Sequence, residues 1–186
     1  MVWRYWDCHI SSFSFVYSSS DEVLIVRDMF GVKPLYYSFI DKDIIVASEI
    51  KSILAYKKEA IINEEGLCEL LGMGPSHSIG KTLYKDIYEV KPGHYLTFSK
   101  DLGLKEHRYF YLQAQEFNLN YENTVLKVRE LLDDAIKKQS VSDVGISSFL
   151  SGGLDSSIIA TILKDGDGKF VLFGSCREPA VGVSRC

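Results

Sequence analysis

The sequence of 186 residues has no long apolar run. A membrane-spanning helix needs roughly 20 continuous apolar residues, and no segment approaches that length. It also has no excess of basic residues, because 21 Lys+Arg stand against 25 Asp+Glu and the formal net charge is -4. Nucleic acids and anionic membranes are bound through clustered basic side chains, so we expect neither as a partner. The first ten residues contain no apolar signal-peptide core, and we expect a cytoplasmic protein.

Cysteine is scarce and scattered. Cys8, Cys68, Cys176 and Cys186 form no CxxC pair and no metal-ligand spacing, which is typical of reduced thiols in the cytosol. By contrast, 46% of the residues are hydrophobic and 12% are aromatic, enough for a packed core. Disorder of the whole chain is therefore excluded.

The first part of the chain is rich in predicted strands. Short apolar runs separated by polar turn residues predict antiparallel hairpins over 13–17, 23–26, 35–40 and 44–47. Further elements are expected as helices over 49–56 and from Asn63 to about Gly72 and Gly74, and as strands over 95–98 and 108–111. The segment from Asp28 to Pro34 is predicted to be a tight loop in which Gly31 has a positive φ and Phe30, Tyr36 and Tyr37 pack the hairpin.

The pattern of apolar residues changes near residue 115. Apolar residues recur at helical spacing over 122–139, and a strand is expected over 144–150. A glycine-rich turn and a second apolar helix follow, which is the opening of a parallel α/β unit. We therefore predict one domain over 1–115 and another over 116–186.

The strongest chemical signal is the segment from Phe149 to Ser157, which reads FLSGGLDSS. A strand ends, two glycines let the backbone approach a ligand, and a helix begins with hydroxyls and an acid. Free N–H groups at a helix N-terminus favour a phosphate or pyrophosphate. No Walker lysine follows, so Mg²⁺ would neutralise the charge, with Asp155 as its candidate ligand. The alternative is a plain turn with Ser156 as the N-cap and no ligand.

These motifs also carry a family resemblance. Ser-Gly-Gly-Leu-Asp-Ser-Ser resembles the pyrophosphate loop of ATP pyrophosphatases, and with Ser142-Asp143-Val144 before it resembles that of asparagine synthetases. Residues 27–37 (RDMFGVKPLYY) and 47–54 (ASEIKSIL) look like the later part of a class II (Ntn-type) glutaminase domain, and 91–94 (KPGH) is similar to the interdomain region of that family. The resemblance spans roughly residues 13 to 163.

The resemblance implies a fold of two classes, α+β followed by α/β. The first is the later half of an Ntn-hydrolase αββα sandwich with antiparallel strands, and the second is the first βα unit of a parallel-sheet, adenine-nucleotide alpha-hydrolase-like domain. The family hydrolyses glutamine, activates aspartate with Mg-ATP as β-aspartyl-AMP and releases asparagine, AMP and pyrophosphate. Its partners are these small molecules and, in a complete member, a second copy in a homodimer.

The resemblance also implies the site residues. ATP or pyrophosphate would be held by the segment after the strand, which comprises Leu150, Ser151, Gly152, Gly153, Leu154, Asp155, Ser156 and Ser157. Asp155 would also hold Mg²⁺. No catalytic residue is assigned.

The sequence differs from the family pattern at both ends, and these two differences lower the activity that we expect. An Ntn-type glutaminase uses the α-amine of a first cysteine as base, whereas position 2 is Val2 and Cys8 is internal. The tail from about Lys164 does not continue the family pattern. We therefore expect an inactive piece of a glutamine-hydrolysing asparagine synthetase, from a truncated or frameshifted reading frame. The alternatives are another carboxylate-amidating or cyclising synthetase, and a non-catalytic ATP- or pyrophosphate-binding module.

Overall fold

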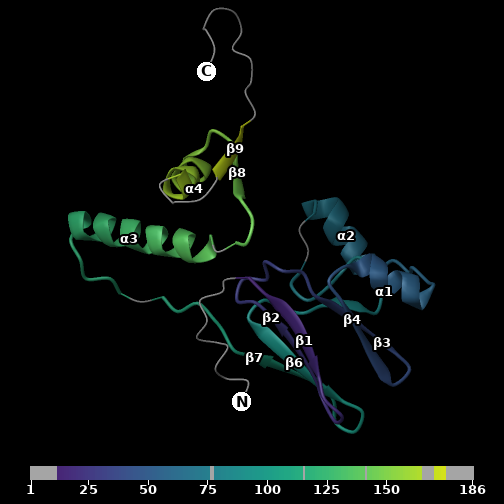
Figure 1. Ribbon diagram of the computed structural model, residues 1–186. Coiled ribbons are helices and arrows are strands. Elements are labelled where there is room, and N and C mark those ends of the chain that lie inside the picture. Colours follow the sequence, from purple (N-terminus) through teal and green to yellow (C-terminus); the bar gives the residue numbers. More distant parts are fainter. Residues whose placement is uncertain (1–11, 76–77, 115, 141, 165–169, 175–186) are drawn as a thin grey trace, which may run out of the picture. The chain divides into compact units, whose positions relative to one another are not determined.

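The computed structural model describes residues 12–75, 78–114, 116–140, 142–164 and 170–174. The chain divides into two compact units, one within Ser11–Gln115 and the other within Glu116–Cys186 (Figure 1). Val2, Cys8, Cys176 and Cys186, which figured in the sequence predictions, lie outside the described residues.

Two antiparallel sheets form the first unit (Figure 1). One has the strand order β1 (Ser14–Ser18), β2 (Val23–Arg27), β6 (His94–Ser99) and β7 (Gly103–Arg108). The other has the order β4 (Asp43–Ala47), β3 (Tyr36–Ile40) and β5 (Ile87–Glu89). Residues from both sheets and from the segments beside them share one core, built around Ile25, Leu35, Val90 and Leu96.

Two helices follow the β3–β4 hairpin. The first, α1 (Ile50–Lys57), packs on β3 and β4 and buries Ile53 completely. The second, α2 (Glu64–Met73), begins at Asn63, whose side chain accepts a hydrogen bond from the Glu65 N–H, and ends at Gly74. Both helices were predicted from sequence, as was this cap, which satisfies one of the orphan donors at the helix start.

The strand predicted over 108–111 is wrong beyond its first residue, because β7 ends at Arg108. The N–H groups of Tyr109 and Phe110 both donate to the carbonyl of Gly93, at 2.9 and 3.2 Å, which takes them out of the strand ladder. A bend replaces the strand end. It brings residues 109–112 against the Pro92–Gly93 turn.

Polar contacts hold the loop after β2, beside the predicted packing of Tyr37, which is confirmed because its ring packs against the core. Asp28 is fully buried, and its carboxylate accepts hydrogen bonds from the N–H groups of Phe30, Val32 and Lys33 at 2.9 to 3.0 Å. The Arg27 guanidinium donates to the carbonyls of Lys33, Gly31 and Val90 and forms a 2.7 Å ion pair with Glu89.

The positive φ predicted for Gly31 is confirmed at 67°. The packing role predicted for Phe30 is wrong, because its side chain is 60% exposed. Buried charge at Arg27 and Asp28 fixes this loop, and the Phe30 ring is left on the surface.

The buried region around Asp28 should make the stability of the protein depend on alkaline pH, because Tyr109 is partly buried beside it. The Tyr109 hydroxyl donates to the Arg27 carbonyl at 2.6 Å, and burial together with the Asp28 carboxylate raises the pKa of Tyr109 to about 12. The unfolded phenol ionises near 10.0, so the folded state loses stability as the pH rises from about 10 to about 12. Circular-dichroism melts should show this fall. The loss of stability between about pH 10 and 12 should be smaller in Tyr109→Phe than in the native protein. Tyr56 is 68% exposed, so Tyr56→Phe should leave the loss unchanged.

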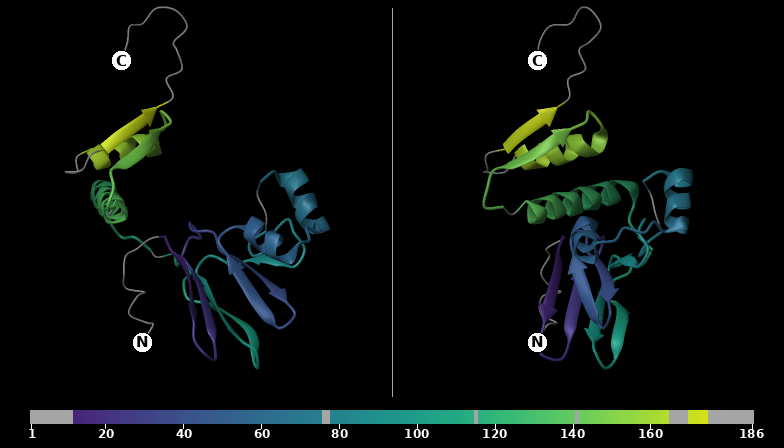
Figure 2. Two further views of the ribbon diagram at one scale, coloured as in Figure 1. Left: turned by 45° about the vertical axis from the view of Figure 1, so that its right-hand side comes forward. Right: turned by 90° about the vertical axis from the view of Figure 1, so that its right-hand side faces the viewer.

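The second unit begins with a long helix. Helix α3 (Tyr121–Gln139) starts at Asn120, whose side chain accepts from the Asn123 N–H at 2.9 Å. Strand β8 (Ile146–Leu150), helix α4 (Leu154–Lys164) and strand β9 (Phe170–Gly174) follow, and β8 and β9 pair in parallel (Figure 2). This βαβ arrangement confirms the α/β class predicted for this part, as the antiparallel sheets confirm the α+β class of the first.

Strand β9 was missed by the sequence analysis, which predicted one βα unit only. Its pairing covers one edge of β8 over five residues, from Ile146 opposite Phe170 to Leu150 opposite Gly174. Among the residues that the structure describes, no helix is long and apolar enough to cross a membrane.

Candidate functional site

The glycine-rich loop lies where the sequence placed it, between the last residue of β8, Leu150, and the first residue of α4, Leu154 (Figures 1 and 2). Leu150 is half-buried, and the loop residues Ser151, Gly152 and Gly153 are exposed. The structure therefore keeps the predicted residues together, because they are consecutive in the chain. Their backbone faces solvent at the N-terminus of α4.

Three serines fasten this loop to the first turn of α4. The Ser151 and Ser156 hydroxyls are 2.9 Å apart, and the Ser151 N–H donates to the Ser156 hydroxyl at 3.3 Å. The hydroxyls of Ser156 and Ser157 both donate to the Gly153 carbonyl, at 3.2 and 2.7 Å. Ser156 lies inside α4, so the alternative that made it the N-cap is wrong.

The two glycines are required for different reasons. Gly152 has a φ of 80°, a conformation that side-chain-bearing residues rarely adopt. Gly153 has no such constraint, and a Cβ there would meet only the Ser151 hydroxyl at 3.4 Å. The protein itself would thus accept a side chain at Gly153. A glycine at this position leaves the space beside the backbone free for a ligand.

The loop fits a phosphate group. An α-helix leaves the N–H groups of its first turn without intrahelical partners, so those of Leu154, Asp155 and Ser156 can serve an anion. The positive end of the α4 dipole adds attraction at the same point. The exposed carboxylate of Asp155 stands in this first turn and can hold a cation bound to such an anion.

A closed metal centre does not accompany the loop. Within the described ranges, no group of three or more His, Cys, Asp and Glu residues could hold a metal ion. Mg²⁺ would therefore be held by Asp155 together with phosphate oxygens and water, the usual manner for this ion in nucleotide sites.

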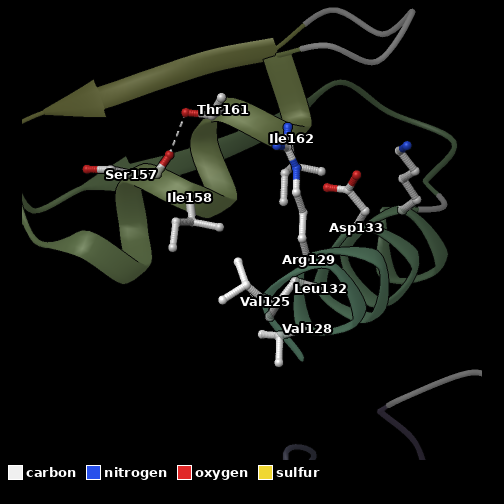
Figure 3. A pocket seen from close by; sticks show the side chains of 10 residues that line it. Val125, Val128, Arg129, Leu132, Asp133, Ser157, Ile158, Thr161 and Ile162 are labelled. Atoms are coloured by element: carbon white, nitrogen blue, oxygen red, sulfur yellow. Dashed lines mark hydrogen bonds between the residues drawn. The ribbon is translucent and has the colours of Figure 1, made fainter. Parts of the chain in front are cut away.

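An apolar groove runs behind the loop, between α3 and α4 (Figure 3). Its volume is about 540 Å³, and Val125, Val128 and Leu132 of α3 face Ile158 and Ile162 of α4 across it. The charged residues that line the groove are Arg129, Lys137 and Asp133. The groove lining is mostly apolar, whereas the loop presents backbone N–H groups at a helix N-terminus.

The described part of the first unit holds one cysteine thiol. Cys68 is the one cysteine that the structure describes; it is exposed and lies in the middle of α2. A residue inside a helix has no free α-amine, which an Ntn-type thiol uses as its base.

Comparison with known proteins identifies the family. Residues 10–110 match the glutamine amidotransferase domain family, and residues 127–171 match the asparagine synthase family. The first match covers more than half of the chain, so the chain belongs to the glutamine amidotransferase domain family. The second match includes the loop from Ser151 to Ser157.

Several curated proteins are similar to this chain. Asparagine synthetase (glutamine-hydrolyzing) 3 of Bacillus subtilis strain 168 is 44% identical over 137 residues, which are 73% of this chain and 22% of that protein. A putative asparagine synthetase (glutamine-hydrolyzing) 2 of Methanocaldococcus jannaschii is 36% identical, over 75% of this chain and 28% of that protein. The amidase chry2 of Gibberella zeae is 32% identical, over 77% and 21%. The chain thus spans about a quarter of the length of these relatives.

Among solved structures, the chain is similar to the glutamine phosphoribosylpyrophosphate amidotransferase of B. subtilis complexed with ADP and GMP. The TM-score is 0.33 at 16% identity, over 87% of this chain and 32% of that one.

One sequence expectation is corrected by these matches. The family pattern was expected to stop near Lys164, but the asparagine synthase match continues to residue 171. The pairing of β9 with β8 provides the structural reason, since residues 170–174 supply the next parallel strand of the same sheet.

Proposed function

We propose that this chain is part of a glutamine-hydrolysing asparagine synthetase. The observation that carries the proposal is the order of the two family matches, with the Ser-Gly-Gly-Leu-Asp-Ser-Ser loop at the β8–α4 junction of the second. Residues 1–115 would belong to the glutaminase domain and residues 116–186 would begin the ATP-binding synthetase domain. The whole enzyme would make asparagine from aspartate, ATP and glutamine-derived ammonia, in the cytoplasm and as a homodimer, without nucleic-acid partners.

In this proposal, the β8–α4 loop holds the pyrophosphate part of ATP. The N–H groups of the first turn of α4 would bind its oxygens, and the hydroxyls of Ser151, Ser156 and Ser157 would keep the loop in place. Mg²⁺ bound at Asp155 would neutralise the charge of the departing pyrophosphate when the aspartate carboxylate attacks the α-phosphate. Leu150 and Leu154 border this loop on the strand and helix sides.

Calorimetric titration of the chain with pyrophosphate tests this assignment. In the presence of Mg²⁺ we expect binding, and Asp155→Ala should weaken it at least tenfold because the metal loses its carboxylate ligand. Omission of Mg²⁺ should weaken binding to the native chain and have little further effect on the variant. Asp101→Ala, at an exposed acid in the turn before β7, serves as the matched control and should bind as the native chain does. Equal binding by the Asp155 variant would contradict the proposed metal ligand.

We also propose that the 186-residue chain alone hydrolyses no glutamine, because Cys68 lacks the α-amine that the thiol chemistry uses. Ammonia release from glutamine, abolished by Cys68→Ser, would overturn this statement. A second candidate is a synthetase of the same architecture that amidates or cyclises another carboxylate; the relatives include one protein named an amidase. The two candidates differ in the carboxylate that is activated. The β8–α4 loop would bind pyrophosphate in the same way in both reactions.

A further inference from the structure

A second cavity lies in the first unit, outside the elements that carry the proposed chemistry. Its volume is about 500 Å³, and it forms where the loop after β2, the Pro92–Gly93 turn and the segment after β7 meet. Cavities of this size hold small molecules in many proteins. Every residue that lines it belongs to the same compact unit.

Much of the cavity wall is apolar and open to solvent. The rings of Phe30 and Phe110 meet edge to face with centroids 5.7 Å apart. Large faces of Phe30, Ile79 and Tyr111 remain uncovered, with 60%, 68% and 56% of the side chains exposed. Isolated apolar residues are common on surfaces, but here they gather around one hollow. A ligand with an apolar ring would cover them.

The cavity lining has basic side chains and no carboxylate. Lys91, His94 and Arg108 line it, and no Asp or Glu does. Glu106 neutralises Lys91 through a 2.8 Å ion pair from outside the lining. Among the residues that the structure describes, no carboxylate forms an ion pair with Arg108, so its guanidinium is free for a ligand and the site matches an anion with a single charge.

Arg108 is also oriented for such a ligand. Its Nε donates to the Phe110 carbonyl at 3.0 Å, and its guanidinium carbon lies 5.3 Å from the centre of the Tyr111 ring. These contacts fix the plane of the guanidinium and use one of its five N–H groups, so the terminal nitrogens can bind a carboxylate in a bidentate manner.

Backbone contacts connect two walls of the cavity. Gly93 has a φ of 66°, and a Cβ there would lie 2.9 Å from the Phe110 carbonyl oxygen. The turn and the segment after β7 are thus in close contact. The buried carboxylate of Asp28 and the guanidinium of Arg27 hold the opposite loop from below.

We propose that this cavity binds a small carboxylate that bears an apolar ring, with Arg108 holding the carboxylate and Phe30, Phe110 and Tyr111 surrounding the ring. The proposal is independent of the asparagine synthetase assignment. It concerns residues that the pyrophosphate loop does not include, so either one can fail without the other.

The test uses 3-phenylpropionate as the probe and amide chemical shifts of the full chain as the readout. We expect shifts centred on Gly93, His94 and Phe110, with a Kd on the order of a millimolar for so small a ligand. The neutral analogue 3-phenylpropionamide should bind at least tenfold more weakly. Pyrophosphate, added to the same sample, should leave these shifts unchanged.

Variants separate specific recognition from general attraction. Arg108→Gln should weaken binding at least tenfold. Lys105→Gln removes a charge from the same strand outside the cavity and should change the Kd less than twofold. Leu112→Glu, at a side chain 77% exposed on the cavity rim, should abolish binding without loss of fold, which the dispersed amide spectrum verifies. Equal binding of acid and amide, equal effects of the Arg108 and Lys105 variants, or shifts centred elsewhere would overturn the proposal.

Discussion

Gly153→Ala is expected to weaken pyrophosphate and ATP binding by tenfold or more and to leave the fold intact. The protein has room for the new methyl group, since the nearest atom to a Cβ at this position is the Ser151 hydroxyl at 3.4 Å. The methyl group would instead occupy the space that a phosphate needs above the start of α4. Loss of affinity without loss of stability would separate a ligand requirement from a folding requirement.

Calorimetry and thermal unfolding of the same samples measure the two effects. Gly72→Ala is the matched control, because Gly72 lies in α2 and a Cβ there meets nothing within 4 Å. That substitution should leave binding unchanged and stabilise its helix by about 0.5–1 kcal/mol. Unaltered binding by Gly153→Ala would contradict a phosphate at this loop. The Gly152→Ala variant is less informative, because its φ of 80° would strain any side chain.

The candidate loop was predictable because its residues are neighbours in the sequence. A strand, two glycines and a helix start determine the position of the loop, and no distant contact is needed to bring its members together. The hydroxyl contacts of Ser151 with Ser156 were not predicted, but they too span only five residues. Local sequence therefore predicts the position of such a loop well.

Distant contacts explain the failures in the first unit. The apolar rings near Asp28 suggested packing, yet Arg27 binds Glu89 and Val90, which are 62 and 63 residues away in the chain. The end of β7 likewise depends on the Gly93 carbonyl, which captures the N–H groups of two residues that continue an apolar, strand-like run. The hydrophobic periodicity of the sequence, which indicates local helices and strands, cannot predict these long-range contacts.

The buried pair at the start of the loop leads to the largest expected change in stability. Asp28→Ala leaves the N–H groups of Phe30, Val32 and Lys33 without their carboxylate acceptor in a part-buried environment. An unsatisfied buried donor costs about 1–3 kcal/mol, and these three are part-buried, so the variant should lose about 3 kcal/mol or more, a large share of the stability of a small domain. Urea unfolding followed by circular dichroism would measure this loss.

Two further variants assign the loss to the hydrogen bonds of Asp28. Asp28→Asn keeps one oxygen for two of the donors but directs an amide toward the third, so we expect an intermediate loss, about half that of Asp28→Ala. Asp101→Asn changes an exposed acid in the turn before β7 and should alter the free energy of unfolding by less than about 0.5 kcal/mol. If Asp28→Ala were as stable as Asp101→Asn, the loop would have to be held by Arg27 alone. The cavity bordered by Phe30 should then survive in Asp28→Ala, whereas we expect its ligand affinity to fall together with the stability.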